Sequence, residues 1–190
     1  QVRALTATHM TALSAADVAE FTTDQLGALT ATQAVALTST NMATLADTQI
    51  QALTTTALRS LSQTNFASFS TTQLAALTTQ QAAALTNTQL NALTSTKLGA
   101  FTETQIQALT TAQVASISTT NLTSLGATQI AALAATQVAN LSATQVAALN
   151  ATNVGSLTET QIAAITSTQI KSLSTTNLSA FDATQAAALT

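Results

Sequence analysis

The sequence predicts an all-α solenoid, a fold in which short helices stack in coils, and two observations lead to this prediction. An eight-residue unit, here called an octad, repeats without insertion or deletion from Thr6 to Leu189 and gives 23 full copies. Each copy also carries, at fixed places, the residues that begin a helix and bury one of its faces. Partial octads stand before and after the full ones, so we expect residues 1–190 to form a single array.

The octad has the consensus T-x-T-Q-(I/V/L)-x-A-L, and each position follows its own rule. Position 1 is Thr or Ser in 18 of the 23 copies, position 3 is Thr in 19, and position 4 is Gln or Asn in 19. Position 5 is apolar and position 8 is Leu, Ile or Phe in every copy, whereas positions 2 and 6 vary and accept charges such as Glu103 and Lys171. Strict apolarity indicates a core and free variation indicates solvent, so we expect positions 5 and 8 to lie inside.

The spacing of polar and apolar residues matches the start of a helix. Thr or Ser followed three residues later by Gln is close to a capping box, with position 1 as the N-cap and position 4 as the third helical residue. Where position 1 is neither Thr nor Ser, Gly126, Asn150 and Asp182 are also good N-caps. Positions 8 and 5 flank the cap as the pair that forms a hydrophobic staple, for example Leu157 and Ile162. This motif leaves the constant Thr at position 3 unexplained.

Other regular structures fit the octad less well. A continuous helix fails because eight residues turn its apolar stripe by about 80° per unit, and supercoils absorb only periods near about 3.5 or 3.67 residues per turn. A β-solenoid is the alternative, since Thr, Val and Ile favour strands. However, positions 5 and 8 have opposite parity, so one straight strand cannot bury both. Tight corners also favour Gly or Asn, yet the chain has four Gly and no Pro.

Helices of about six residues are not stable alone, so the octads must stack on one another. The uniform period does not reveal how many octads make one turn. Asn41 and Asn65 are 24 residues apart, as are Asn153 and Asn177, which favours three octads per turn. Asn121 and Asn153 are instead 32 residues apart, which leaves the number open.

Composition excludes several classes of function. Only 6% of residues are charged and the net charge is −3, so no basic patch exists to bind nucleic acid or an anionic membrane. No apolar run approaches the roughly 20 residues that cross a bilayer, so we expect no membrane insertion. The chain has no cysteine, which excludes disulfides and thiolate metal sites.

The chemistry-bearing residues do not form a catalytic pattern, so we expect no enzyme, no cofactor and no metal site. His9, the only histidine, and Lys97 both stand at position 4, where we interpret them as substituted capping residues. Asp17, Glu20 and Asp24 are the one candidate cation cluster, but no EF-hand or calcium nonapeptide motif accompanies them. The many hydroxyls have no adjacent base. The glycines are isolated and form no phosphate loop: Gly27, Gly99, Gly126 and Gly155. The phenylalanines all occupy core positions 5 or 8: Phe21, Phe66, Phe69, Phe101 and Phe181.

Octads such as residues 126–133 and 142–149, which contain TQIAAL and TQVAAL, resemble the Thr/Ala-rich tandem arrays of very large exported bacterial surface proteins. The resemblance is to adhesins and fibre-forming proteins, and it extends over the whole chain. It implies a secreted or cell-surface structural role as a rod, fibre or adhesin stalk. The calcium-binding Gly/Asp nonapeptides common in such proteins are absent here, which removes the basis for calcium-driven folding.

The terminal residues predict that the partners of the array are further copies of the same repeat. Residues 1–5 match positions 4 to 8 and Thr190 matches position 1, so neither end carries the polar cap of a solenoid. We expect further repeats of the same polypeptide, or other copies of it stacked end to end, to cover Val2, Leu5 and Leu189. The alternative function is ice or crystal-surface binding through the regularly spaced threonines of position 3. The sequence names no surface or glycan target.

Overall fold

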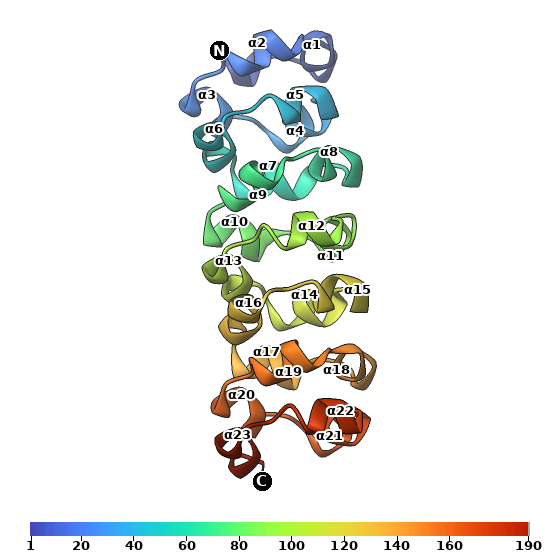
Figure 1. Ribbon diagram of the computed structural model, residues 1–190. Helices are drawn as coiled ribbons and strands as arrows, with labels where there is room; N and C mark the ends of the chain where they lie inside the picture. The colour runs from blue at the N-terminus through green and yellow to red at the C-terminus, as the bar shows by residue number, and fades with distance from the viewer. Residues whose placement is uncertain (190) are drawn as a thin grey trace. The chain divides into compact units, whose positions relative to one another are not determined.

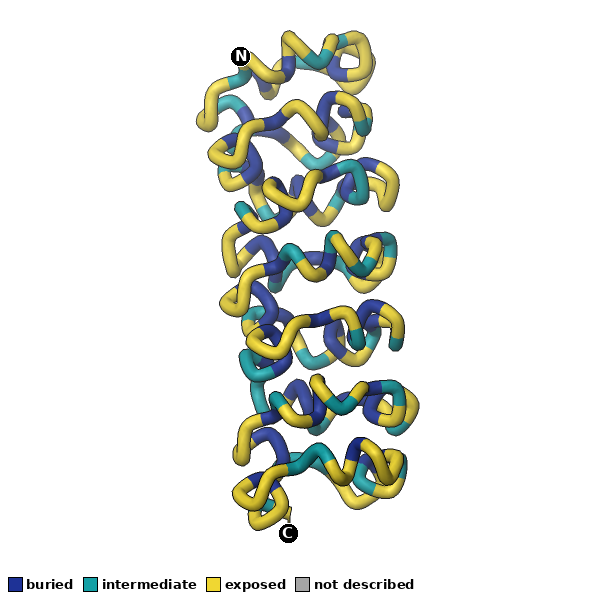
Figure 2. The backbone as a smooth tube through the Cα atoms, in the orientation of Figure 1, coloured by how far each residue is buried: buried dark blue, intermediate teal, exposed yellow. Residues whose placement is uncertain are grey.

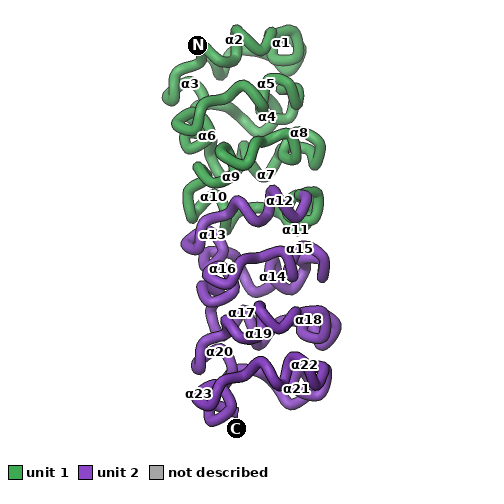
Figure 3. The backbone as a smooth tube through the Cα atoms, in the orientation of Figure 1, with its two compact units in different colours: residues 1–93 green, residues 94–190 purple. Residues whose placement is uncertain are grey.

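The computed structural model describes residues 1–189, and Thr190 lies outside them. Within residues 1–189 each octad forms one α-helix, 23 in all, and no strand occurs (Figure 1). This confirms the predicted all-α solenoid of short helices and argues against the β-solenoid. The chain divides into two compact units, residues 1–93 and 94–190, and the boundary falls between two octads (Figure 3).

The first unit contains a short 3₁₀-helix and eleven α-helices of five or six residues. Their bounds are η1 Val2–Ala4, α1 Ala7–Ala12, α2 Ala15–Ala19, α3 Thr23–Gly27, α4 Ala31–Ala36, α5 Ser39–Ala43, α6 Asp47–Ala52, α7 Thr55–Ser60, α8 Gln63–Ala67, α9 Thr71–Ala75, α10 Thr79–Ala84 and α11 Asn87–Asn91.

The second unit contains twelve helices of four to six residues. Their bounds are α12 Ser95–Leu98, α13 Glu103–Ala108, α14 Thr111–Ser116, α15 Thr119–Thr123, α16 Ala127–Ala132, α17 Ala135–Ala139, α18 Ala143–Ala148, α19 Ala151–Gly155, α20 Glu159–Ala163, α21 Ser167–Ser172, α22 Thr175–Leu178 and α23 Ala183–Ala187.

Most helices begin at a capping box, as the sequence predicts, whereas at α7, α8, α12, α15 and α22 only the N-cap side chain accepts a hydrogen bond. At α10 the Thr78 hydroxyl accepts a hydrogen bond from the Gln81 backbone N–H at 3.1 Å, and Gln81 Oε1 accepts one from the Thr78 N–H at 2.9 Å. Two backbone donors that the helix leaves unpaired are satisfied in this way. Where position 1 has no side-chain acceptor, as at Ala46, Gly126 and Ala134, only the second of these bonds remains.

The bends between helices are made by extended residues. Leu37 ends α4 with φ −69° and ψ 143°, and Thr38 begins α5 with φ −83° and ψ 164°. No residue in the described range has a positive φ. The corners therefore need none of the left-handed conformations that favour glycine, which explains how the chain turns so often with four glycines.

Each coil of the solenoid consists of three octads. In both units, every helix packs on the helix three places later along the chain, as α4 does on α7 and α18 does on α21 (Figure 1). The 24-residue spacing of Asn41 and Asn65 therefore indicates the correct number. The 32-residue spacing of Asn121 and Asn153 does not correspond to a turn.

Positions 5 and 8 form the core of each unit, as expected (Figure 2). Phe66 and Phe69 are both fully buried, and their ring centroids lie 5.4 Å apart with the planes tilted at 59°. The exceptions lie in the first and last coils. Leu178 and Leu189, at positions 5 and 8 of the last coil, are 40% and 38% exposed because no later coil within the described residues covers them.

Candidate functional site

The amide at position 4 joins one coil to the preceding one. Gln81 Nε2 donates to the carbonyl oxygens of Ile50 and Leu53, both at 2.8 Å and respectively 31 and 28 residues earlier. These carbonyls lie at and just after the C-terminal end of α6, where a helix leaves its acceptors unpaired. Because Gln81 Oε1 also caps α10, one buried side chain satisfies the start of one helix and the end of another.

The same arrangement recurs in the second unit. Gln161 Oε1 accepts from the Thr158 N–H at 2.7 Å, while Nε2 donates to Ile130 O at 2.9 Å and Leu133 O at 2.6 Å. Asparagine is shorter, and Asn177 Nδ2 donates to a single carbonyl, that of Leu149, at 2.6 Å. The sequence analysis identified position 4 as a capping position but missed this second role, because the carbonyls that it binds lie four octads away.

The threonines of position 3 are exposed, and their hydroxyls are mostly unused by the fold. The side chain at position 3 is exposed in all 23 octads, including the 19 that carry Thr. Within residues 1–189, only two of these hydroxyls bond a protein atom: that of Thr104, with Thr102 Oγ1 at 3.0 Å, and that of Thr184, with Asp182 Oδ1 at 2.6 Å. Each coil thus presents threonine hydroxyls and methyl groups to solvent.

Position 3 also discriminates between threonine and serine. Serine takes the place of threonine at position 1 in six octads, where only the hydroxyl is needed for capping, yet no octad has serine at position 3. Local helix preferences do not explain this choice, since serine is as good a helix residue as threonine and acids are favoured near helix N-termini. Every hydroxyl at position 3 thus comes with a methyl group.

The residues singled out for chemistry mostly cap helices. His9 Nδ1 accepts from the Thr6 N–H at 3.2 Å and so takes the capping role expected of it. Lys97 does not: its backbone N–H donates to the Thr94 hydroxyl at 3.3 Å, but α12 has no reciprocal bond because an ammonium group cannot accept one. Asp17 accepts from the Ser14 hydroxyl at 2.7 Å and the Ser14 N–H at 2.8 Å, and these bonds lower the pKa of its carboxyl.

The acidic residues Asp17, Glu20 and Asp24 are all exposed. No group of three or more His, Cys, Asp or Glu side chains that could hold a metal ion occurs among residues 1–189. In the same range, no helix has the length and apolar character required to cross a membrane.

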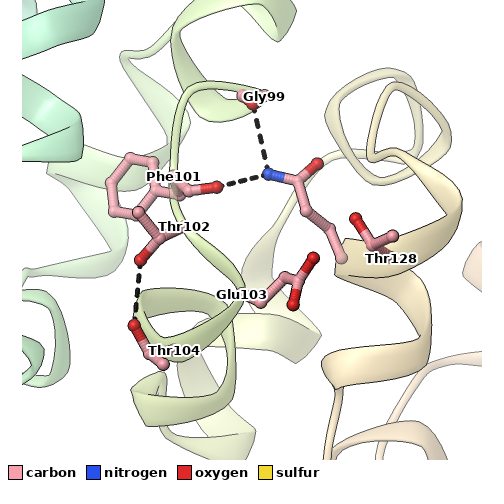
Figure 4. Close-up of a pocket in the computed structure, with 7 residues that line it drawn as sticks. Gly99, Phe101, Thr102, Glu103, Thr104 and Thr128 are labelled. Atoms are coloured by element: carbon pink, nitrogen blue, oxygen red, sulfur yellow. Dashed lines mark hydrogen bonds between the residues drawn. The ribbon is translucent and has the colours of Figure 1, made fainter.

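Two similar pockets lie in the second unit. The first has a volume of about 510 Å³ and is lined by Gly99, Phe101, Thr102, Glu103, Thr104, Thr128 and Gln129. The second, of about 470 Å³, is lined by Gly155, Ser156, Leu157, Thr158, Glu159, Thr160, Asp182, Thr184 and Gln185. Every residue that lines the first pocket has a counterpart in the second, 56 residues later. In Figure 4 the side chains of Glu103, from α13, and Thr128, from α16, both extend into the space between these helices.

The 56-residue spacing reflects a longer repeat of seven octads, which the sequence analysis missed. Acids recur at position 2 every 56 residues, as Asp47, Glu103 and Glu159. Asparagines recur at position 4 with the same spacing, as Asn65, Asn121 and Asn177, and so do the serines Ser60, Ser116 and Ser172 at position 7. Aligning every seventh octad would have revealed this pattern, whereas the pockets also require the three-octad coil that pairs α13 with α16.

No protein-family model matches the chain, and no curated protein matches its sequence. The geometry of the chain's own residues is therefore the basis for any function.

Proposed function

We propose that the chain is a structural repeat protein that forms an extracellular rod, fibre or adhesin stalk. The observation that carries the proposal is the position-4 amide, which links coil to coil in both units through buried hydrogen bonds. Linking each coil only to its neighbours is the principle of a solenoid whose length can grow by adding repeats. His9 and Asp17 contribute to the same fold by accepting capping hydrogen bonds at the starts of α1 and α2.

An extracellular location is supported by composition and by the style of the repeat. The chain has no cysteine and very few charges, and its octads resemble those of large exported bacterial surface proteins. A surface that is rich in Thr and Ser remains hydrated with little net charge, whereas most Gln and Asn side chains of position 4 are buried. Such a surface suits a spacer that must not bind nucleic acid or anionic membranes.

The partners that we propose are further coils of the same repeat, from the same polypeptide or from other copies. The stacking within each unit supports this, because the helices of one coil pack on those of the next and the position-4 amides bind carbonyls of an earlier coil. A groove of about 190 Å³ in the second unit offers a surface for such packing and is lined by Ile162, Ile165, Ser167, Ile170, Lys171 and Leu189. Another coil would cover these side chains as each coil covers the one before it.

Two measurements on the native protein test the proposal. Immunogold labelling of intact cells of the source organism should mark the cell surface or fibres attached to it. Labelling that appears only after lysis would contradict an extracellular role. Intact mass from the same cells distinguishes the two kinds of partner: a mass near 19.2 kDa together with filaments indicates separate copies, and a much larger mass indicates further repeats.

The second candidate function is binding to ice or to another crystal surface. The exposed threonines of position 3 favour it, because they combine a hydroxyl that the fold mostly leaves free with a methyl group that serine would not supply. Thermal hysteresis of a concentrated solution is the direct test. A freezing point equal to the melting point would exclude ice as the target.

A further inference from the structure

We propose that the two pockets of the second unit are copies of one binding site for a neutral saccharide. They are centred on Glu103 and Glu159, which stand at position 2 of octads seven places apart. This binding function is additional to the proposed structural role, and it can be tested without any filament.

The pockets share a wall that is free of side chains. Gly99 and Gly155 stand at position 6, four residues before the glutamates, and leave backbone exposed where all other octads except that of Gly27 have a side chain. Their carbonyl oxygens accept from Gln129 Nε2 at 3.2 Å and Gln185 Nε2 at 3.1 Å. The hydrogen bonds from Gln129 and Gln185 thus hold this backbone in place, and its exposed side remains open to a ligand.

The groups that face each pocket are available to a ligand. The carboxylates of Glu103 and Glu159 make no hydrogen bond or ion pair within residues 1–189, and both side chains are exposed. Each pocket also has one threonine hydroxyl without a partner in this range, that of Thr128 in the first and that of Thr160 in the second. Their counterparts in the other pocket are engaged, since Thr184 bonds Asp182 Oδ1 at 2.6 Å and Thr104 bonds Thr102 Oγ1 at 3.0 Å. A carboxylate accepts hydrogen bonds from two adjacent hydroxyls, and threonine both donates and accepts.

These groups suit a polyol better than an ion. An anion would meet a carboxylate and no basic side chain among the lining residues of either pocket. Calcium requires about six to eight oxygen ligands, whereas the first pocket offers one carboxylate and its carbonyls of Gly99 and Phe101 already accept from Gln129. The second pocket has a further carboxylate, Asp182, but its Oδ1 already accepts from the Thr184 hydroxyl and the Gln185 N–H. Volumes of about 510 and 470 Å³ fall in the range of small-molecule sites and would hold a disaccharide.

The seven-octad spacing determines how the sites are presented. Three octads make one coil, so seven octads make two coils and one further octad. The pocket of Glu159, on α20, therefore lies two coils after that of Glu103, on α13, and is displaced by one octad around the coil, onto an adjacent face of the second unit. Shallow polar sites with no aromatic platform bind single sugars weakly, in the millimolar range, and repetition along the chain would raise the avidity for a surface that displays many sugars.

The four glycines give a direct test by NMR. Labelling the full chain with ¹⁵N-glycine yields four backbone signals, of which Gly99 and Gly155 report on the pockets. Gly27 is the matched reference, since it also stands at position 6 but is followed by Ala31 where the pockets have glutamate. The probes are three neutral disaccharides, maltose, cellobiose and lactose, each titrated to millimolar concentrations.

We expect at least one disaccharide to shift the Gly99 and Gly155 signals and leave Gly27 in place. E103Q should weaken the response of Gly99 about tenfold while Gly155 still responds, and E159Q should do the reverse. D47N, which changes the equivalent acid of the first unit, should alter neither signal. All three substitutions are at exposed positions, and circular dichroism checks that helicity is kept. Absence of any shift with all three sugars, or shifts that persist unchanged in E103Q and E159Q, would overturn the proposal.

Discussion

The side-chain amide of Gln81 lies 2.8 Å from the carbonyl oxygen of Leu53, a residue 28 places earlier in the chain. Leu53 ends the octad of α6, one octad before α7, on which α10 packs. This hydrogen bond therefore links the start of α10 to the segment between α6 and α7, and α7 is the helix on which α10 packs. Repetition of this contact explains why a chain of helices too short to be stable alone holds a regular fold.

Removing one such amide should destabilise the chain. In Gln161→Ala the N–H of Thr158 and the carbonyl of Leu133 lose their partner, while the Ile130 carbonyl keeps the bond from the Leu133 N–H. Unpaired buried groups cost about 1–3 kcal/mol each, so the free energy of unfolding should fall by about 2–5 kcal/mol in urea titrations. Gln107→Ala is the control, because Gln107 is exposed at position 6. Equal stability of the two variants would refute the structural role of the amide.

The apolar positions allow a paired test within one octad. Leu37, at position 8, is 1% exposed, whereas Val35, at position 6, is 50% exposed. Leu37→Ala should lower the free energy of unfolding by about 2–5 kcal/mol through lost burial and the cavity that remains. Val35→Ala should change it by less than about 0.5 kcal/mol. Thermal or urea unfolding measures both changes. A larger effect at Val35 than at Leu37 would contradict the assignment of position 8 to the core and position 6 to the surface.

Acid should reduce the stability that the capping carboxylates of Asp17 and Asp182 contribute. Hydrogen bonds from the Ser14 hydroxyl and N–H lower the pKa of Asp17, and bonds from the Gln185 N–H and the Thr184 hydroxyl lower the pKa of Asp182. A lowered folded-state pKa contributes stability that is complete above the ordinary aspartate value of about 3.9 and is lost as pH falls through the lowered value.

The double variant Asp17→Asn with Asp182→Asn removes these two titrations. Between about pH 5 and pH 2 the unchanged chain should therefore lose more stability than the variant does, as measured by urea unfolding at each pH. The expected difference is small because both carboxylates are exposed. Identical pH profiles would mean that neither cap contributes through its charge.

The threonines of position 3 should be dispensable for folding. Four of them are the second residues of α12, α15, α18 and α21, helices that stack on one another in the second unit, and all four are exposed: Thr96, Thr120, Thr144 and Thr168. Replacing all four with serine should leave helicity intact and change unfolding by less than about 0.5 kcal/mol per site. If the surface binds ice, the same variant should lose thermal hysteresis, since the methyl groups are removed. A large loss of stability would instead assign these threonines to the fold.

Much of the fold follows from the octad itself. The capping box and the burial of positions 5 and 8 depend on residues within one octad and its neighbours, so a single copy such as residues 78–85 is sufficient to predict them. The number of octads per turn, in contrast, does not follow from a single octad. It depends on how the amide of Gln81 meets the end of α6, a contact that a uniform period of eight does not encode.

The pockets were harder to predict for a related reason. Glu103 looks like any variable residue of position 2 until it is compared with Glu159, seven octads later. Their common environment arises from pairing with α16 and α23, each three helices further on. Only the coil of three octads brings Glu103 to Thr128, so the octad alone does not predict this neighbour.

Engineered disulfides test the three-octad coil most directly, because the chain has no cysteine of its own. A Cβ at Gly155, at position 6 of its octad, would lie 3.5 Å from the carbonyl oxygen of Ala180, at position 7 three octads later. Cysteine at position 155 can be paired in turn with cysteine at Ser172, Ala180 or Ala188, which are the position-7 residues two, three and four octads later. The three-octad coil predicts that only the pair 155 and 180 closes rapidly under mild oxidation with helicity preserved. Preferential closure of the pair 155 and 172, or of the pair 155 and 188, would contradict it.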